Sequence, residues 1–341
     1  MDSGDGILFT RILTGPGFFH AIAAEVNDEA RTVLGAVLPV FGITVAGWVI
    51  RKLNWLTEEA DQSLLRVNIN LLFPCLILDA ALGNPALSQW RNLVLAPAVG
   101  FGTITLGMFL ALAARRLAGL KDPKAARTFA VTTGVYNYAY VPLPLALLLF
   151  GSRTTGVLFV HNVGVELAMW TLGVSLLAGT GMERDWRKIL NAPVVAIILA
   201  LALNGIGLGA VLPRPVSTGI HWLGQCAIPM ALILIGAVVA DHLSEFHSSA
   251  GWRVIATAVL LRIVVLPALF LLLARYLPAS LELKQVMVLE AAMPAAVFPI
   301  VMSRHYGGDP PTALRVVIGT SVVGLLTIPL WIRLGMKWVT M

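Results

Sequence analysis

The sequence has very little charge. Asp, Glu, Lys and Arg together make up 12% of its 341 residues, about half of their share in a soluble domain. A soluble domain of this size is excluded, because its surface would need charged and polar side chains to face water. Apolar residues make up 58% of the chain, and the mean hydropathy is +0.84. The composition therefore predicts an integral membrane protein.

Catalytic and metal-binding motifs are also missing from the sequence. Its two cysteines, Cys75 and Cys226, lie inside apolar runs without the spacing of a metal site. It has no HExxH motif, no phosphate-binding loop and no GxSxG motif. The sequence therefore predicts a protein that is not an enzyme and that holds no metal and no cofactor.

The positive charge is scattered, which argues against a nucleic-acid partner. The net charge is +6, but the basic residues are spread over loops, and basic loops stay on the anionic cytoplasmic side of a membrane. One set of alternate loops carries fourteen Lys and Arg residues, whereas the other set, with both termini, carries nine. We therefore expect a protein of the cell membrane, in contact with lipid, with both termini extracytoplasmic.

Long apolar runs recur along the whole chain. A helix needs roughly 20 apolar residues to cross the hydrocarbon core of a bilayer. An all-α membrane protein with about ten transmembrane helices is predicted, preceded by an extracytoplasmic segment at residues 1–31. Hydropathy predicts the spans at about 32–50, 63–82, 92–114, 128–150, 154–178, 190–213, 216–240, 253–275, 285–303 and 312–333.

Prolines at a constant offset indicate an internal repeat. Pro74 and Pro229 stand 155 residues apart in similar apolar contexts, and so do Pro144 and Pro299. This offset matches the second predicted span with the seventh and the fourth with the ninth. Because five spans per half is an odd number, the second half must enter the membrane from the opposite side, as in many secondary transporters. The predicted units are two five-helix repeats and a cytoplasmic linker, at residues 32–178, 190–341 and 179–189.

The fourth and ninth spans each contain two prolines. Pro142 and Pro144 lie in the fourth span, and Pro294 and Pro299 lie in the ninth. Proline lacks a backbone donor and clashes with the preceding turn, so two prolines close together should open a helix. Broken helices in corresponding positions of two inverted repeats indicate a transport site. The alternative is that these prolines only kink the two helices so that they pack against their neighbours.

The segments around these prolines resemble a known family. "VYNYAYVPLPLALLLFG" and "AAMPAAVFPIVMSRHYG" are similar to the two crossover segments of the auxin efflux carrier (PIN-like) family of permeases. "INLLFPCLILDAAL" and "LAMWTLG" resemble the family's second and fifth helices. The resemblance implies two inverted five-helix repeats, a scaffold domain and a transport domain, and crossing, broken helices 4 and 9. It also implies small organic anions as substrates: auxin in plants, and dicarboxylates such as malate and malonate in bacteria.

The resemblance assigns roles residue by residue. The chain lacks the long cytoplasmic loop of the plant proteins, so it is similar to the compact bacterial type. It departs from the family in having Pro142 where small residues are usual and Glu166 where the fifth helix tends to be neutral. The residues that match the crossover positions, and that the resemblance implies at the substrate site, are Asn137, Pro144, Pro294 and Pro299.

Ionisable residues inside predicted spans are the remaining candidates. Charges at membrane depth are costly, so Glu290, Glu166 and Asp79 are interpreted as sites of proton or cation coupling. The alternatives are a protonated structural role for the two glutamates and simple hydration for Asp79. Arg262 either belongs with these carboxylates or extends toward the cytoplasmic surface. Tyr136, Tyr138 and Tyr140 either line a solute cavity or serve as packing residues, and they are left out of the predicted site.

Together these patterns predict a secondary transporter of a small organic anion. Alternating access would take place at the helix 4/helix 9 crossover. Asn137 would bind substrate or the unwound backbone, and Pro142, Pro144, Pro294 and Pro299 would shape the crossover. One alternative is a sodium-coupled symporter of the bile-acid type, and another is a membrane sensor that keeps a transporter fold without flux. A proton or a sodium ion is the expected coupling partner, and a homodimer is one option for the assembly.

Overall fold

The computed structural model describes residues 35, 38–179, 190–208, 212–242 and 251–340. Throughout these ranges the regular elements are helices, with no strand beyond one isolated bridge. The predicted all-α class is confirmed. The predicted N-terminal segment at residues 1–31 and nearly all of the predicted linker lie outside the described residues.

The helices follow one another with short connections. A helix at residues 38–52 comes first. The labelled elements are α3 (Glu58–Val67), η1 (Asn68–Leu72), α4 (Phe73–Ala81), η2 (Pro85–Ser88), α5 (Trp90–Ala113), η3 (Ala114–Arg116), α6 (Pro123–Gly134), α7 (Pro142–Ala168), η4 (Met169–Gly173), α8 (Val174–Ala178), α9 (Ala192–Gly205), α10 (Arg214–His242), α11 (Trp252–Val259), η7 (Leu260–Val265), α12 (Leu266–Tyr276), α13 (Leu281–Ala292), α14 (Phe298–His305) and α15 (Pro310–Thr340).

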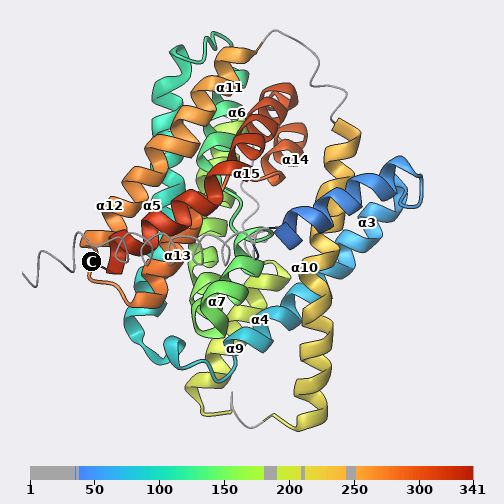
Figure 1. Cartoon of the computed structure of the whole chain (residues 1–341), viewed down its shortest axis with the longest axis vertical. Helices are drawn as coiled ribbons and strands as arrows, with labels where there is room; N and C mark the ends of the chain where they lie inside the picture. Colours follow the sequence, from blue (N-terminus) through green and yellow to red (C-terminus); the bar gives the residue numbers. More distant parts are fainter. Residues whose placement is uncertain (1–34, 36–37, 180–189, 209–211, 243–250, 341) are drawn as a thin grey trace, which may run out of the picture.

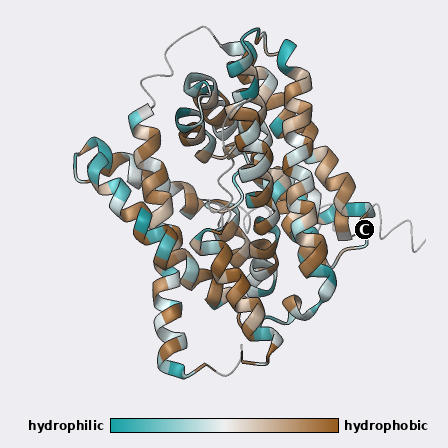
Figure 2. Ribbon diagram, turned by 180° about the vertical axis from the view of Figure 1, so that it is seen from behind, coloured by the Kyte–Doolittle hydropathy of each residue, from teal (hydrophilic) through white to brown (hydrophobic). Residues whose placement is uncertain are grey.

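Six helical stretches within the described ranges are long and apolar enough to cross a membrane, and Figure 2 shows hydrophobic residues along most of the helices. The chain is therefore a multi-pass membrane protein. The helix Ala192–Gly205 is apolar but shorter, and the predicted spans at 128–150 and 285–303 are each divided between two helices. That ten segments cross the bilayer stays a prediction. The six stretches are Glu58–Ala81, Trp90–Arg116, Pro142–Ala178, Arg214–Asp241, Trp252–Tyr276 and Pro310–Val339.

The helices form two groups with α7 between them (Figure 1). Helices α3, α4, α9 and α10 pack on one another on one side of the molecule, with α10 along its edge. Helices α5, α6 and α11–α15 pack together on the other side. Helix α7 contacts α5 and α13 in the second group and α4 in the first. The centre of the molecule is therefore built around α7.

Glycines bring α5 and α7 close together. A Cβ atom on Gly100 would overlap the carbonyl of His161, and one on Gly164 would overlap the carbonyl of Pro97. Small residues allow such close approach between membrane helices, where packing rather than hydrophobicity drives association. Helix α5 and the second half of α7 are therefore held as one unit.

A π-helical turn precedes the proline in α12. Pro267 has no N–H for the carbonyl of Ile263, four residues earlier, and η7 widens the helix at this point. The indole nitrogen of Trp331 in α15 donates to the Ile263 carbonyl at 2.8 Å. The Ile263 carbonyl therefore has a hydrogen-bond donor, although Pro267 cannot supply one.

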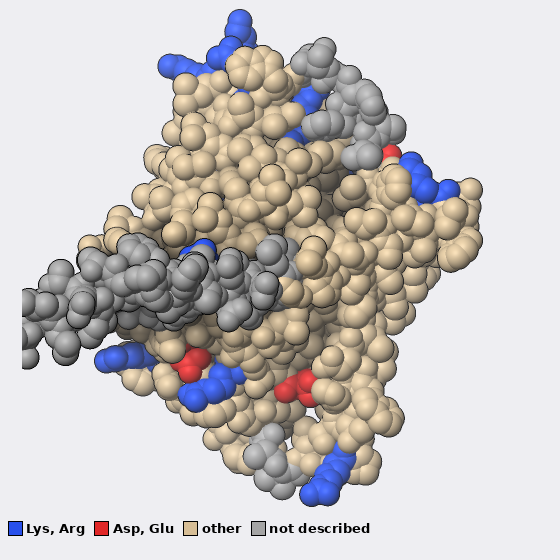
Figure 3. Space-filling model, in the orientation of Figure 1, with Lys and Arg blue, Asp and Glu red and all other residues tan. Residues whose placement is uncertain are grey.

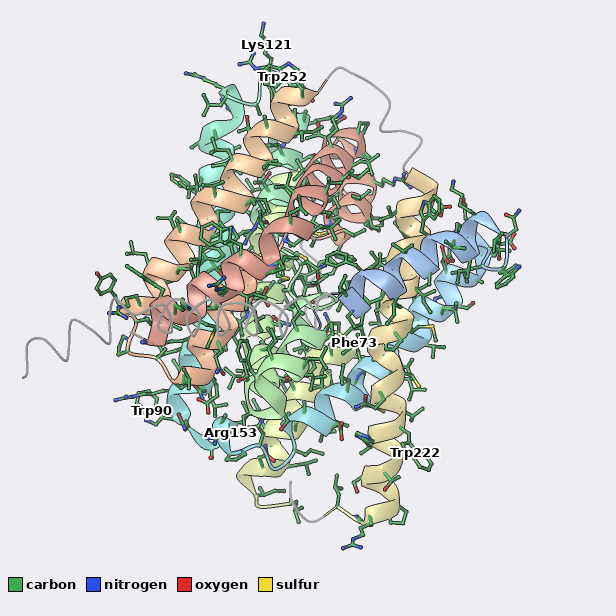
Figure 4. All side chains as sticks on the ribbon, viewed as in Figure 1. Phe73, Trp90, Lys121, Arg153, Trp222 and Trp252 are labelled. Atoms are coloured by element: carbon green, nitrogen blue, oxygen red, sulfur yellow. The ribbon has the colours of Figure 1, made fainter. Side chains whose placement is uncertain are left out.

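Exposed aromatic and basic side chains mark the two ends of the molecule. Trp90, Trp222 and Trp252 are about 70% exposed and lie toward the ends of the long axis in Figure 4, as expected for residues at a membrane interface. Lys121 and Arg153 lie at opposite ends (Figure 4). On the face in Figure 3, most Lys and Arg side chains lie toward these ends, with a broad band of uncharged residues between them.

Candidate functional site

The first break in a helix lies between α6 and α7. Helix α6 ends at Gly134 and α7 begins at Pro142, so residues 135–141 leave the helical path. Pro142 is the first residue of α7 and Pro144 the third, and both are buried. The first residues of a helix need no N–H for an intrahelical bond, so proline is well tolerated there. The two prolines therefore start the new helix after the break.

The second break lies between α13 and α14. Helix α13 ends at Ala292 and α14 begins at Phe298. Pro294 lies inside the non-helical segment, and Pro299 is the second residue of α14. Each predicted proline pair therefore marks a real interruption of its helix.

The two breaks are joined through their main chains. Tyr136 and Ala295 form an antiparallel bridge. The Asn137 N–H donates to the Pro294 carbonyl at 2.9 Å, and the Ala296 N–H donates to the Val135 carbonyl at the same distance. Backbone groups freed at membrane depth must find partners inside the protein. Here each break supplies partners for the other.

Asn137 supports the first break with its side chain. It is 7% exposed, and its Oδ1 accepts from the N–H groups of Tyr140 at 3.1 Å and Val141 at 3.4 Å. Asn162 of α7 donates through Nδ2 to the Tyr138 carbonyl at 2.7 Å. Among the described residues, the hydrogen bonds of the Asn137 side chain use its oxygen, which leaves its Nδ2 as a donor for a ligand.

Arg262 supports the second break. Its Nε donates to the Met293 carbonyl at 2.9 Å, and its Nη2 donates to the Glu290 carbonyl at 3.0 Å. The guanidinium also lies 5.0 Å from the centre of the Tyr136 ring, close enough for a cation–π contact. Arg262 is 0% exposed, so the alternative that it extends toward the cytoplasmic surface is wrong. The carbonyls at the end of α13 hold it inside the protein.

Glu290 lies one turn before the second break and is 1% exposed. Neither of its carboxylate oxygens has a hydrogen-bond partner among the described residues. Nη1 of Arg262 is likewise buried without a hydrogen-bond acceptor there. Removing a charged group from water without a partner is costly, so this pair is unusual for a protein interior.

Glu166 has three partners instead of none. Its Oε1 accepts from the Tyr138 hydroxyl at 2.7 Å. Its Oε2 accepts from the indole nitrogen of Trp170 at 2.7 Å and from Nδ2 of Asn191 at 3.2 Å. Indole N–H is a donor only, so Oε2 acts as an acceptor. Neutral groups from three parts of the chain therefore orient this carboxylate.

A cavity of about 230 Å³ lies beside the two breaks. Both breaks contribute to its wall, together with α4, α7, η4 and α9. Glu166 is the one Asp, Glu, Lys, Arg or His on this wall among the residues that can be described. The lining residues used below are Asn137, Tyr138, Tyr140, Phe159, Glu166, Trp170, Asn191, Val297 and Phe298.

The family comparison agrees with this architecture. The family described as "Membrane transport protein" matches residues 32–187 and 184–332, which is most of the chain. The chain belongs to this family. The predicted resemblance to auxin efflux carrier-like permeases is therefore confirmed.

Three relatives of this chain carry the names of transporters or carriers. An uncharacterized transporter of Methanothermobacter thermautotrophicus is 27% identical over 86% of this chain and 96% of its own length. Auxin efflux carrier component 8 of Arabidopsis thaliana is 26% identical over 81% of this chain and 70% of its own. A putative malonate transporter of Rhizobium meliloti is 24% identical over 87% of this chain and 93% of its own. As a membrane transport protein, this chain takes a small-molecule substrate in a membrane setting.

The predicted site residues of this membrane transport protein fall into three places. Asn137 and Glu166 share the cavity wall, and Pro299 follows Phe298, which also lines it. Glu290 lies behind the breaks and is not among the residues that line the cavity. Asp79 lies apart from both, where its Oδ2 is 3.0 Å from Nδ1 of His221 on α10 and both side chains are partly exposed.

Several cavity residues were missed by sequence reasoning. Tyr138 and Tyr140, left out of the predicted site, line the cavity, and Tyr138 also binds Glu166. Trp170 could have been found, because it stands four residues after Glu166 on the same helical face. Asn191 could not have been found from the sequence. Its Oδ1 accepts from the Val194 N–H at 3.0 Å and caps α9, and an asparagine before a helix ordinarily has this role alone.

Proposed function

We propose that this chain is a secondary transporter that moves a small organic anion by alternating access at crossing, broken helices. The observation that carries the proposal is the position of the cavity, which borders the starts of both α7 and α14 at the two breaks. Helix N-termini carry partial positive charge and unpaired N–H groups, which favour a bound carboxylate. The placement of a solute between two half-helices is typical of secondary transporters.

The proposed substrate contacts follow from the same wall. Nδ2 of Asn137 would donate to the solute carboxylate, and Tyr140, Val297 and Phe298 lie where the two half-helices start. Pro142, Pro144, Pro294 and Pro299 would hold the two openings in shape without touching the solute. Most of the remaining lining residues are apolar or aromatic, which suits the carbon skeleton of an organic acid.

Alternating access needs two bodies that move relative to one another. We assign the helix at residues 38–52, α3, α4, α9 and α10 to a scaffold, and α5–α8 and α11–α15 to a transport unit. The cavity lies where these groups meet, because α4 and α9 line it from one side and α7 and both breaks from the other. This assignment is compatible with two inverted repeats at residues 32–178 and 190–341.

Coupling of solute transport to a proton or cation would use a buried carboxylate that lies outside the cavity wall. Glu290 is buried without a hydrogen-bond partner among the described residues, so it needs a proton or a cation to offset its charge. It lies one turn from the backbone that closes the cavity. We propose Glu290 as the first coupling candidate. Glu166 and Asp79 remain further candidates, although the partners of Asp79 place it away from the breaks.

Transport by the purified protein tests this function. In proteoliposomes loaded with unlabelled 3-phenylpropionate or malonate, the protein should take up the same labelled acid by saturable counterflow. Asn137→Ala should raise the solute Kd by roughly 5- to 150-fold, because losing one partner in a buried site costs about 1–3 kcal/mol. The matched control is Asn70→Ala on the exposed face of η1, which should leave the Kd unchanged.

Two results would contradict the proposal. If neither acid shows saturable counterflow while binding is measurable, the protein senses its ligand rather than transporting it. If Asn137→Ala folds normally and keeps the wild-type Kd and rate, the site does not lie at the first break. Dependence of uptake on sodium, measured in the same vesicles, would assign the coupling to that ion.

A further inference from the structure

The cavity carries a fixed negative charge in an unexpected place. Glu166 lines it, and Trp170 and Asn191 direct donors at the same carboxylate oxygen, 2.7 Å and 3.2 Å away. Across the part of the cavity wall that is described, no Lys, Arg or His offsets this charge. An ordinary anion site has the opposite balance, with cations or donors facing the ligand.

The cavity wall also offers a hydrogen-bond donor, the side-chain amide of Asn137. Nδ2 of Asn137 is available there, since the hydrogen bonds of this amide use Oδ1. The wall thus presents a donor at the breaks and an acceptor on α7. These groups would bind the two charged groups of a dipolar solute.

Aromatic rings surround the carboxylate. Tyr138 and Trp170 both donate to Glu166, and the ring of Trp170 stands 5.8 Å from that of Phe298, edge to face. Phe159 and Tyr140 add further rings to the wall. A carboxylate beside several aromatic rings can bind an ammonium group by ion pairing, and the ring faces nearby can add cation–π contact.

We propose that the transported solute carries an ammonium group beside its carboxylate, as an amino acid with an apolar side chain does, and that Glu166 binds this ammonium group. The inference rests on the proposed function, because the carboxylate of the solute still lies at the breaks. It narrows the substrate class from organic anions to zwitterions. A simple dicarboxylate would bring a second negative charge toward Glu166 without any cation to offset it.

Three ligands that share a phenyl ring separate these charges. L-phenylalanine carries both groups, 3-phenylpropionate carries the carboxylate alone and 2-phenylethylamine carries the ammonium alone. We expect the wild-type protein in nanodiscs, measured by titration calorimetry, to bind L-phenylalanine at least about tenfold more tightly than either partial ligand. Glu166→Gln should lose about tenfold in affinity for L-phenylalanine and keep its affinity for 3-phenylpropionate.

The control variant is Glu59→Gln, a neutralised carboxylate on the exposed surface of α3, which should bind all three ligands as the wild type does. If the wild type binds 3-phenylpropionate as tightly as L-phenylalanine, the inference is overturned while the proposed function stands. If it binds none of the three, the inference also falls, and the counterflow experiment decides the proposed function separately. Should Glu166→Gln not fold, the wild-type comparison still gives the answer.

Discussion

Two glutamates, Glu166 and Glu290, show how differently one residue type is used within a single membrane protein. Glu166 has three hydrogen-bond donors and faces the cavity. Glu290 has no such partner within the described chain and lies behind the breaks, near Arg262. A satisfied carboxylate acts as a fixed binding group, whereas an unsatisfied one needs a proton or a cation. The two therefore suit different roles, one in binding and one in coupling.

The role of Glu290 leads to a prediction about energy coupling. Glu290→Gln keeps the size of the side chain and permanently removes its charge. Exchange of solute between loaded vesicles should then persist, whereas accumulation driven by a pH gradient should disappear. The measurement is uptake of labelled solute with and without an imposed gradient, after the wild type has been shown to respond to it. A variant that still accumulates solute would exclude Glu290 as the coupling group.

At this scale the sequence predicted some residues and missed others for physical reasons. Asn137 stands out because amides are rare in apolar spans, and the structure brings it to the cavity wall. The prolines stand out because two of them lie close together in each of two spans. The role of Arg262 could not be read in the same way. Its partners are the main-chain carbonyls of residues 290 and 293, and no sequence pattern identifies a distant carbonyl as a partner.

At the scale of elements, the breaks are supported unequally. The first relies on neutral amides, Asn137 and Asn162. The second relies on the permanent charge of Arg262 at the C-terminal end of α13, where a cation also complements the helix dipole. The proline pairs predicted that the fourth and ninth spans are each interrupted, but they did not predict which residues leave the helix. The opening at 135–141 precedes Pro142, because proline is tolerated at a helix start.

Arg262 therefore gives a prediction about stability. Arg262→Met fills similar space but removes the donor to the Met293 carbonyl, at a cost of about 1–3 kcal/mol for that unsatisfied group. The Glu290 carbonyl keeps the N–H of Met293 as a donor at 3.3 Å. The thermal unfolding midpoint in detergent should fall clearly below that of wild type. Arg262→Lys should lie between them, because lysine keeps the charge but not the fork of donors.

Arg253→Met is the matched control, since Arg253 lies on the same helical stretch but is exposed. Its midpoint should equal that of the wild type. Equal midpoints for Arg262→Met and the control would show that the second break does not depend on this guanidinium.

At the scale of the whole molecule, the open question is how often the chain crosses the bilayer. Hydropathy located the apolar stretches, but it cannot distinguish one continuous helix from two half-helices that meet at membrane depth. For this reason two predicted spans are each divided between two helices, α6 with α7 and α13 with α14. A third boundary falls at Gly151, where φ is 76° and the path of α7 changes direction.

Side-specific labelling tests the topology. The basic side should be cytoplasmic, so cysteines introduced at Lys121 and at Lys337 should react with an impermeant maleimide from opposite faces of the cell membrane. Cys226 is exposed and must first be replaced by serine, while Cys75 is buried. Labelling of both positions from the same face would contradict ten spans. Serine in place of Cys226, without added cysteine, serves as the unlabelled control.

The main-chain link between the two breaks has a consequence for how this molecule tolerates mutation. Its two hydrogen bonds, from Asn137 to Pro294 and from Ala296 to Val135, join backbone atoms alone. Side-chain replacement at these four positions leaves both donors and both acceptors in place, except where proline replaces a donor residue. Side chains around the link can therefore change to suit new solutes while the main-chain contact between the two breaks is kept. A membrane transport protein built on such a link can change its substrate without losing the contact that satisfies the backbone groups of both breaks.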